Sequence, residues 1–243
     1  MHPKEPTAIL FALTSPGAVP INEYTTWYDS DHAPSRAAVP GVITARRYKS
    51  LDAQRPEWLA VYELSSADVL ESAPYKKLWH KEPKYEHDLI QRCDTLDRRV
   101  YTLMTRKTSK EYADIEGETA EKKKERVFMA VGLQPKPGSD LTDEEYNRWY
   151  EEEHIPLLAK VPGWLRSTRW MLKDAHGKDM AEVDKSKVPK FLAIHEWESK
   201  ESLVTKEMKV ATTTEWRARV MGSIDPVAEE RRHFGLWKEF SCE

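Results

Sequence analysis

The chain lacks cysteine pairs, long apolar runs and a signal-like start. Cys93 and Cys242 are the only two cysteines among 243 residues, too few for a disulfide framework and without metal-type spacing, so we expect two reduced thiols. No apolar run approaches the roughly 18–20 residues of a bilayer span, and residues 1–6 (MHPKEP) contain no signal-peptide core. These absences predict a cytoplasmic protein with no membrane partner.

A surplus of positive charge is also missing. The chain has 38 Lys and Arg against 41 Asp and Glu, whereas binding to nucleic acid relies on a basic surface, so we expect no nucleic-acid partner. What is present is an apolar fraction of 40%, enough for a folded core, with 9 Trp, 10 Tyr and 5 Phe. Aromatic residues in this number fill a core or line a pocket for a flat apolar ligand.

The sequence contains one unit twice. Residues 23–34 (EYTTWYDSDHAP) return as residues 145–156 (EYNRWYEEEHIP), a shift of 122 residues that aligns His32 with His154. Of the 26 positions from 23 to 48, 11 are identical in the second copy. Random pairing would give about one or two identities, so the duplication is not a coincidence of composition.

Further matches show where the copies differ in length. Residues 56–63 and 98–103 recur at a shift of 133, so the second copy carries eleven extra residues within the polar stretch 173–188. We interpret that stretch as a long hairpin loop. Residues 106–126, dense in Lys, Glu and Thr, are expected to form a solvated linker or an exposed helix. The predicted domains are a first repeat over residues 1–105 and a second repeat over residues 127–243.

Each copy has the same predicted order of elements. Short apolar or alternating runs indicate strands at residues 8–13, 42–48 and 58–64, and again at residues 127–133, 164–172 and 191–197. A helix between the first two strands, a second helix after the third and a last strand complete the order β-α-β-β-α-β. This is the order of a ferredoxin-like unit, which places the chain in the α+β class.

The first helix of each copy has recognisable ends. Its aromatic residues fall at i, i+3 and i+4, the spacing of one helix face, and Asn22 and Thr142 are the expected N-caps. We expect the helix to end or kink at Pro34 and at Pro156, because proline lacks an amide donor and clashes with the preceding turn.

A sheet with helices on one face must bury its other face, most simply against the second sheet. Side chains alternate along the third strand, so Leu59 and Val61 share one face, and aliphatic residues suit a helix layer. The opposite face is aromatic with polar tips and is expected to line a cavity between the two sheets, although alternation alone does not decide which face points inward. Its members are Trp58, Tyr62, Phe191, His195 and Trp197.

The motif that repeats in the two copies resembles a known family. The pattern W-Y-x3-H-x-P, then V-P-G and a strand with arginine, runs from Trp27 to Arg47 and again from Trp149 to Arg169. It is similar to the EthD-like branch of the dimeric α+β barrel superfamily, over most of the chain apart from the linker. In that superfamily two ferredoxin-like units pack sheet to sheet, usually as a homodimer. The resemblance implies a fused version, which removes the need for a partner subunit without preventing a homo-oligomer.

The resemblance implies several activities rather than one. Relatives include cofactor-independent monooxygenases of aromatic polyketides, polyketide cyclases, lactone isomerases, decarboxylases of phenolic acids and haem-binding branches. We expect a cofactor-free tailoring enzyme that uses acid/base chemistry to cyclise, isomerise or decarboxylate a small aromatic or polyketide-derived substrate. A cofactor-free monooxygenase and a non-catalytic ligand-binding or stress-related oligomeric protein are the alternatives. No metal site is expected, and haem is not expected, although a single axial histidine leaves no spacing signature.

Three histidines are candidate proton carriers. His32 and His154 each follow a carboxylate, and imidazole titrates near neutrality; the alternative is that each bonds the turn kinked by the following proline. His195 replaces Tyr62 in the second copy and lies mid-strand, so it is either a distinctive proton carrier or a bonded core histidine.

Two further pairs are candidate substrate-binding residues, with Trp58, Tyr62 and Phe191 as cavity-lining ones. Tyr28 and Tyr150 lie one helical turn before the histidines, where they orient a ligand or simply pack in the core. Arg47 and Arg169 either hold a substrate anion or pair with Glu63 and Glu196 on the neighbouring strand, and the ion pair is favoured. His80, Glu82, Glu86 and His87 are spaced too loosely to ligate a metal and are expected at a solvated helix end.

Overall fold

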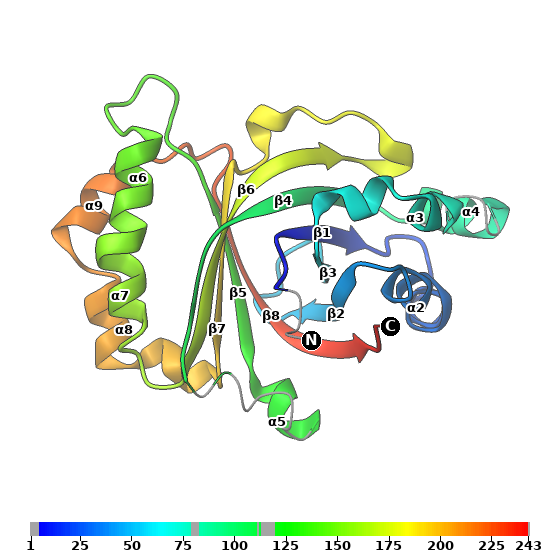
Figure 1. Ribbon diagram of the computed structural model, residues 1–243, viewed down its shortest axis with the longest axis horizontal. Helices are drawn as coiled ribbons and strands as arrows, with labels where there is room; N and C mark the ends of the chain where they lie inside the picture. Colours follow the sequence, from blue (N-terminus) through cyan, green and yellow to red (C-terminus); the bar gives the residue numbers. More distant parts are fainter. Residues whose placement is uncertain (1–4, 79–82, 111, 113–119, 243) are drawn as a thin grey trace. The chain divides into compact units, whose positions relative to one another are not determined.

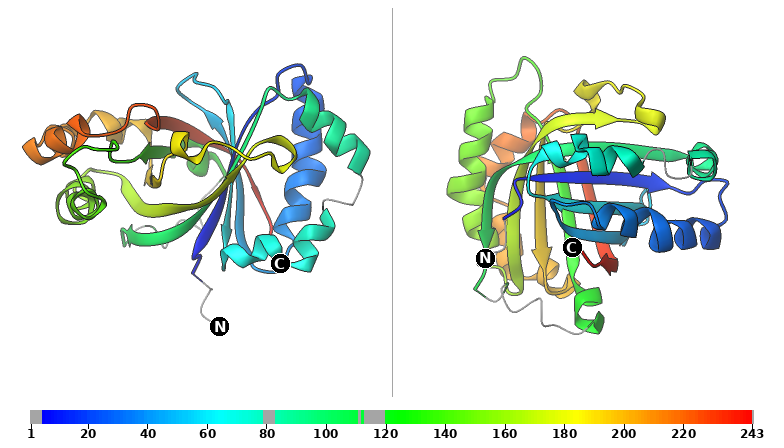
Figure 2. Two further views of the ribbon diagram at one scale, coloured as in Figure 1. Left: turned by 90° about the horizontal axis from the view of Figure 1, so that it is seen from above. Right: turned by 45° about the vertical axis from the view of Figure 1, so that its right-hand side comes forward.

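A computed structural model describes residues 5–78, 83–110, 112 and 120–242 (Figures 1 and 2). Its strands are β1 (Ala8–Ser15), β2 (Val42–Ser50), β3 (Trp58–Leu64), β4 (Thr95–Thr108), β5 (Val127–Leu133), β6 (Trp164–His176), β7 (Phe191–Trp197) and β8 (Glu230–Phe240). They are hydrogen-bonded in the order β1-β3-β2-β8-β5-β7-β6-β4, which closes as a barrel. The predicted fold class, a fused α+β barrel of two ferredoxin-like repeats, is confirmed.

The helices follow the predicted order in both copies. The first repeat has α1 (Ile21–Trp27), α2 (Ala33–Ala37), α3 (Ala73–Lys77) and α4 (Pro83–Arg92). The second has α6 (Asp143–Trp149), α7 (Ile155–Leu158), α8 (Lys206–Ala211) and α9 (Glu215–Gly222), and α5 (Ala120–Glu125) precedes it. Within the predicted linker, β4 runs on to Thr108 and α5 follows the undescribed residues 113–119. None of the described helices is long and apolar enough to cross a bilayer.

The chain divides into two compact units. The first unit contains Met1–Leu103, Met171–Lys185 and Leu236–Glu243, and the second contains Met104–Trp170 and Ser186–Gly235. The first unit therefore combines most of the first repeat with a segment from the second repeat, which overlaps the stretch 173–188 that carries the eleven extra residues.

The repeated helix does not end at its proline. Between α1 and α2 the chain makes one π-helical turn, Tyr28–His32, and Pro34 then lies in the first turn of α2. Proline cannot donate a hydrogen bond to the preceding turn, so a break in the regular α-helical pattern is expected here, and the π-helical turn is that break. The π-helical turn Tyr150–His154 precedes Pro156 in the same way. A π-helical turn changes the direction of the side chains that follow it, and the 3.6-residue periodicity of the sequence does not reveal this change.

Only one of the two expected N-caps is present. The Thr142 hydroxyl accepts a hydrogen bond from the Glu145 amide at 3.1 Å, as predicted. The prediction for Asn22 was wrong: α1 begins at Ile21, two residues earlier than an Asn22 cap requires, and the N-cap position is Pro20, which has no side chain able to cap.

The aromatic face of the third strand was placed on the wrong side. Trp58 on β3 packs against Tyr24 of α1, with ring centroids 5.8 Å apart. In the second unit Phe191 on β7 stacks on Tyr146 of α6 at 5.1 Å. These aromatic residues therefore face the helix layer of their own repeat, where aromatic rings on both elements can pack edge to face. A cavity lined by them must lie between sheet and helices.

Candidate active site

The first unit contains a cavity of about 200 Å³ between its sheet and its helices. The strands β1 and β3 line it with Leu10, Ala12 and Tyr62. The helices and the turns beside them contribute Tyr28, His32, Arg36, Tyr75, Glu86 and Ile90. A neighbouring hollow of about 450 Å³ shares His32, Arg36 and Glu86 with it. The charged groups of the first repeat thus converge where the two spaces meet.

The π-helical turn sets which side chains of the repeated helix reach the cavity. Tyr28 begins that turn and His32 ends it, and their ring centroids lie 4.6 Å apart. The ring centroid of Trp27 also lies close to the imidazole, 4.5 Å from that of His32. Arg36 follows one turn later on α2 and is buried. Three functional groups four residues apart therefore face the same space.

One carboxylate oxygen links the imidazole and the guanidinium. Oε1 of Glu86, on α4, lies 2.9 Å from Nδ1 of His32 and 3.0 Å from Nη2 of Arg36. Arg36 also donates from Nη1 to the His32 carbonyl at 3.1 Å. The expectation that Glu86 decorates a solvated helix end was wrong, because two partners on the repeated helix draw it inward. His80 and Glu82 lie outside the described residues.

Burial and neighbouring charge keep this histidine neutral. Burial, followed by the positive charge of Arg36, lowers the pKa of His32 to about 4, and the hydrogen bond with Glu86 opposes only part of that. Burial by itself would raise the pKa of Glu86, but His32 and Arg36 outweigh it and lower that pKa to about 2. At neutral pH the imidazole is therefore neutral, and its Nδ1 lies within 2.9 Å of a charged carboxylate.

Three phenols complete the cavity wall. Burial raises the pKa of Tyr28, and the charges of Arg47 and Arg36 offset part of the rise. Burial, then the neighbouring Tyr28, raises the pKa of Tyr62 well above its ordinary value. The Tyr75 hydroxyl accepts a hydrogen bond from Nη2 of Arg98 at 3.2 Å. Tyr28 and Tyr62 therefore stay neutral hydrogen-bond donors at physiological pH.

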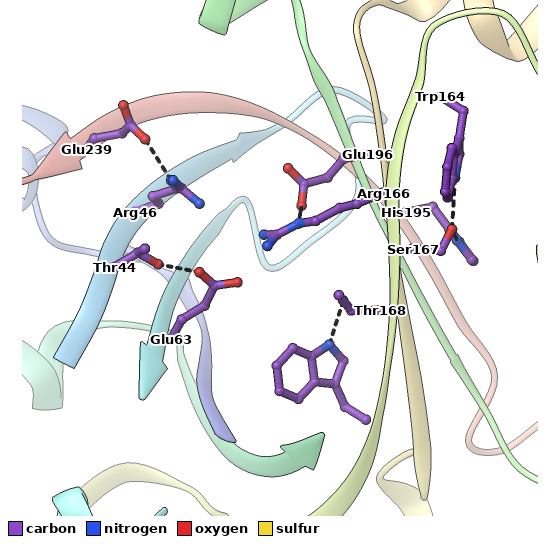
Figure 3. A network of polar contacts seen from close by, with 11 residues as sticks. Thr44, Arg46, Glu63, Trp164, Arg166, Ser167, Thr168, His195, Glu196 and Glu239 are labelled. Carbon is purple, nitrogen blue, oxygen red and sulfur yellow. Dashed lines mark hydrogen bonds and ion pairs between the residues drawn. The ribbon is translucent and has the colours of Figure 1, made fainter. Parts of the chain in front are cut away.

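Arg47 does not pair with Glu63 as expected. Its guanidinium is bonded to Asp29 and lies 4.0 Å from the Tyr28 ring centroid and 4.5 Å from that of Trp58. Glu63 accepts from the Thr44 hydroxyl at 2.8 Å instead (Figure 3). Arg47 points to the aromatic face of the sheet and therefore reaches Asp29 on the repeated helix. Glu63 follows Tyr62 along β3 and so points to the opposite face of the sheet.

The second copy shows the same exchange of partners. Arg169 donates from Nη2 to Asn147 at 2.6 Å and lies 3.6 Å from Glu151, which occupies the position of Asp29. Glu196 is bonded instead to Arg166 on the neighbouring strand, as Figure 3 shows. The guanidinium of Arg169 lies 4.2 Å from the ring centroid of Tyr150. Both arginines thus hold the tyrosine that precedes the motif histidine.

The two histidines of the second unit lie close together in its core. The rings of His154 and His195 are 6.1 Å apart between centroids. His195 Nδ1 is 2.8 Å from the Ser167 hydroxyl, and its Nε2 makes no hydrogen bond within the described residues. Burial, then the charge of Arg217, lowers the pKa of His154 to about 3. Burial also lowers the pKa of His195 well below its ordinary value, with His154 as the next cause.

The second copy lacks the charged partners of the first. The shift of 133 residues holds on both sides of the second helix, so Glu86 corresponds to Arg219. The shift of 122 makes Leu158 the counterpart of Arg36. His154 instead has a hydrogen bond to the backbone of Ala211, which raises its pKa slightly against burial. The imidazole–carboxylate–guanidinium cluster is a feature of the first repeat, and no alternation or period in the sequence marks it.

Among the described residues, no three His, Cys, Asp or Glu side chains lie where they could hold a metal ion together. No protein-family profile matches the sequence, and no curated protein matches it.

Solved structures do share the fold. An anthrone oxidase-like protein superimposes with a TM-score of 0.63 at 14% identity, over 99% of this chain and 95% of its own. A "putative monooxygenase" from Lactobacillus acidophilus NCFM gives 0.56 at 9% identity over 97% and 96%. One from Fusobacterium nucleatum subsp. nucleatum gives 0.56 at 9% identity over 99% and 96%. The chain therefore has the fold of a dimeric α+β barrel built from a single polypeptide.

Proposed function

We propose that the chain is a cofactor-free enzyme of the EthD-like type that removes a proton from a small phenolic or enolisable aromatic substrate in the cavity of the first repeat. The observation that carries this proposal is the neutral His32, whose Nδ1 lies 2.9 Å from Glu86 in the wall of that cavity. An imidazole beside a carboxylate is a common arrangement of a general base.

Each group in the wall has a role in that chemistry. His32 accepts the substrate proton at Nε2, and the adjacent carboxylate of Glu86 stabilises the imidazolium that forms. The buried guanidinium of Arg36 favours negative charge on the substrate. Tyr28 and Tyr62 are neutral donors placed to bind a developing phenolate or enolate oxygen. Because charge develops where fixed donors already lie, the arrangement favours the transition state over the ground state.

The second repeat has a supporting role in this proposal. His154 and His195 are buried, with pKa values lowered by that burial, and neither lines the described cavities. Tyr150, Arg169 and Phe191 pack around one another in the same core. We assign these side chains to stabilising the second unit. In the first unit, Trp58 and Arg47 position Tyr28 and do not contact the substrate.

The fate of the substrate anion separates two reactions. Protonation at another carbon gives isomerisation and, where the substrate carries a carboxylate, allows that carboxylate to leave as CO₂. Attack of the carbanion on a carbonyl carbon of the same molecule gives cyclisation. Direct reaction of the carbanion with O₂ gives a cofactor-free monooxygenase. This second candidate is supported by the names of the solved proteins that share the fold, one anthrone oxidase-like and two described as putative monooxygenases.

Anthrone, which has an acidic methylene group opposite its carbonyl, tests both reactions at once. Exchange of its methylene protons with D₂O, followed by proton NMR, measures proton removal, and an oxygen electrode measures O₂ uptake. We expect wild-type protein to accelerate exchange above the buffer rate and His32→Asn to abolish the acceleration while leaving anthrone affinity within about threefold. Oxygen uptake together with exchange identifies the oxygenase, and exchange without it identifies the acid/base reactions.

His154→Asn is the matched control, because it alters the aligned histidine of the other repeat. It should retain exchange if His32 is the base. Equal loss in both variants, with both still folded by circular dichroism, would contradict the assignment to the first repeat. Anthrone binding without exchange or O₂ uptake would favour a ligand-binding protein.

A further inference from the structure

The insertion of the second repeat lines the cavity of the first. Gly177, Asp179 and Met180 belong to its wall, and all three lie in the segment Met171–Lys185 that forms part of the first unit. They also lie within the polar stretch 173–188, which carries the eleven extra residues of the second copy. The cavity is thus closed by a loop that the duplication itself did not supply.

Polar contacts hold the loop to the end of helix α4. Asp179 lies 3.3 Å from Nδ1 of His87 and accepts a hydrogen bond from Gln91. Lys178 donates from Nζ to the carbonyl of Gln91 at 3.3 Å and to that of Cys93. A lysine at the last carbonyls of a helix is favourable for both hydrogen bonding and the helix dipole. The loop therefore rests on the helix that carries Glu86.

The loop is folded as a small closed unit. Its base is a single antiparallel bridge between His176 and Glu182, and the Gly177 amide donates to the Ala181 carbonyl at 2.8 Å. Asp179 and Met180 have φ angles of 51° and 59°, in the left-handed region that side chains rarely adopt. Backbone of this kind persists when its surroundings hold it, which here are the contacts with α4.

Met180 lies at the mouth of the cavity. Its side chain lines the wall and is still 38% exposed, so one side faces the ligand space and the other faces solvent. The sulfur accepts a hydrogen bond from Nη1 of Arg98 at 3.1 Å, and the same guanidinium donates to Tyr75. A flexible thioether anchored at one point can adjust to the edge of a bound ring.

We propose that residues 177–180 are a lid over the first-repeat cavity and that Met180 is the side chain that limits the size of the ligand. The ligand class rests on the proposed function, whereas the lid rests only on the contacts above. Because His87 and Asp179 are about half exposed, their contact is weak, and lifting the loop has to break mainly the hydrogen bonds of Lys178 and Gln91.

Size selection is tested with 2-tetralone and anthrone, enolisable ketones of two and three rings, whose dissociation constants are measured by calorimetry. Met180→Ala should improve anthrone binding relative to 2-tetralone by about tenfold, the effect of a few methylene-sized groups in an apolar pocket. Met180→Trp should shift the ratio the other way. Met171→Ala is the control, because Met171 is comparably exposed but does not line the cavity. An unchanged ratio in both Met180 variants overturns the assignment.

The lid is tested separately by amide hydrogen exchange of the full chain. Asp179→Ala should speed exchange at residues 177–181 at least fivefold and leave the amides of α4 unchanged. Protection in that segment equal to wild type overturns the lid. If wild-type protein binds neither ketone, the proposed ligand class and the size role of Met180 both fail, while the exchange result still decides whether the loop is a lid.

Discussion

Nδ1 of His32 lies 2.9 Å from Oε1 of Glu86, so the π-helical turn of the first repeat is in direct contact with helix α4. The same oxygen is 3.0 Å from Arg36, and the carboxylate is only 24% exposed. A single carboxylate thus compensates a buried guanidinium and lies beside the imidazole, and substitution can remove its charge.

Glu86→Gln keeps the shape of the side chain and removes its charge. We expect exchange activity to fall about 10–100-fold, because the imidazolium loses its counter-charge. The pKa of His32 should fall further below about 4, since Glu86 is a cause that raises it. The unfolding free energy should fall by about 1–3 kcal/mol, because Arg36 is left buried without a full counter-charge. Urea unfolding and NMR titration of the ring measure these effects. An unchanged or higher pKa of His32 would contradict the positioning role.

His154 predicts how stability depends on pH. Its folded pKa of about 3 lies below the ordinary value of 6.5, so the unfolded chain binds the proton first as the pH falls. Stability is therefore full above pH 6.5 and is lost as the pH falls toward 3. His154→Phe, which keeps a ring on Trp149, should reduce the slope of unfolding free energy between pH 6 and 4 by about 1.4 kcal/mol per pH unit. Urea melts at three pH values test this, and equal slopes would show that His154 is not buried in its neutral form.

The fold could be predicted from the sequence because the two copies of the repeat support the same assignment of helices and strands. Either copy alone contains short apolar runs that are ambiguous between strand and helix, but the aligned pair yields the same order of elements twice. Pro34 and Pro156 also marked where the helix departs from regular α-helical geometry, although the departure is a π-helical turn and not a helix end. That choice depends on tertiary packing of Tyr28 and Tyr150, which no local pattern records.

The site was only partly predictable for a related reason. His32, Tyr28 and Tyr62 could be selected from motif and alternation, and all three line the cavity. Glu86 and Met180 could not, because their roles depend on contacts across the fold, from α4 and from a loop of the other repeat. The one detectable signal was asymmetry: a charged residue or an insertion present in one copy and absent from the other.

Replacing Arg47 is expected to lower the stability of the protein strongly. Its side chain is 1% exposed, is bonded to Asp29 and lies over Tyr28. Arg47→Met should lower the unfolding free energy by about 3–5 kcal/mol, because Asp29 loses the buried charge that compensates it. The pKa of Tyr28 should rise, since Arg47 is a cause that lowers it. Adding Asp29→Asn should recover part of the loss, and urea melts of the single and double variants measure the coupling. Strict additivity would contradict the pairing.

The backbone conformation and surroundings of Gly41 predict that the turn between α2 and β2 requires a glycine. Its φ is +98°, and an added Cβ would lie 2.6 Å from Cγ2 of Val69 and 2.9 Å from the Ser65 hydroxyl. Gly41→Ala should cost about 2–4 kcal/mol, from left-handed backbone strain together with overpacking. Gly138 is the matched control: its φ is +79°, but an added Cβ there meets no atom within 4 Å, so Gly138→Ala should cost only about 1 kcal/mol. Thermal unfolding of the two variants compares strain alone with strain plus collision. Equal losses would mean that Val69 moves aside freely and that the collision does not fix this turn.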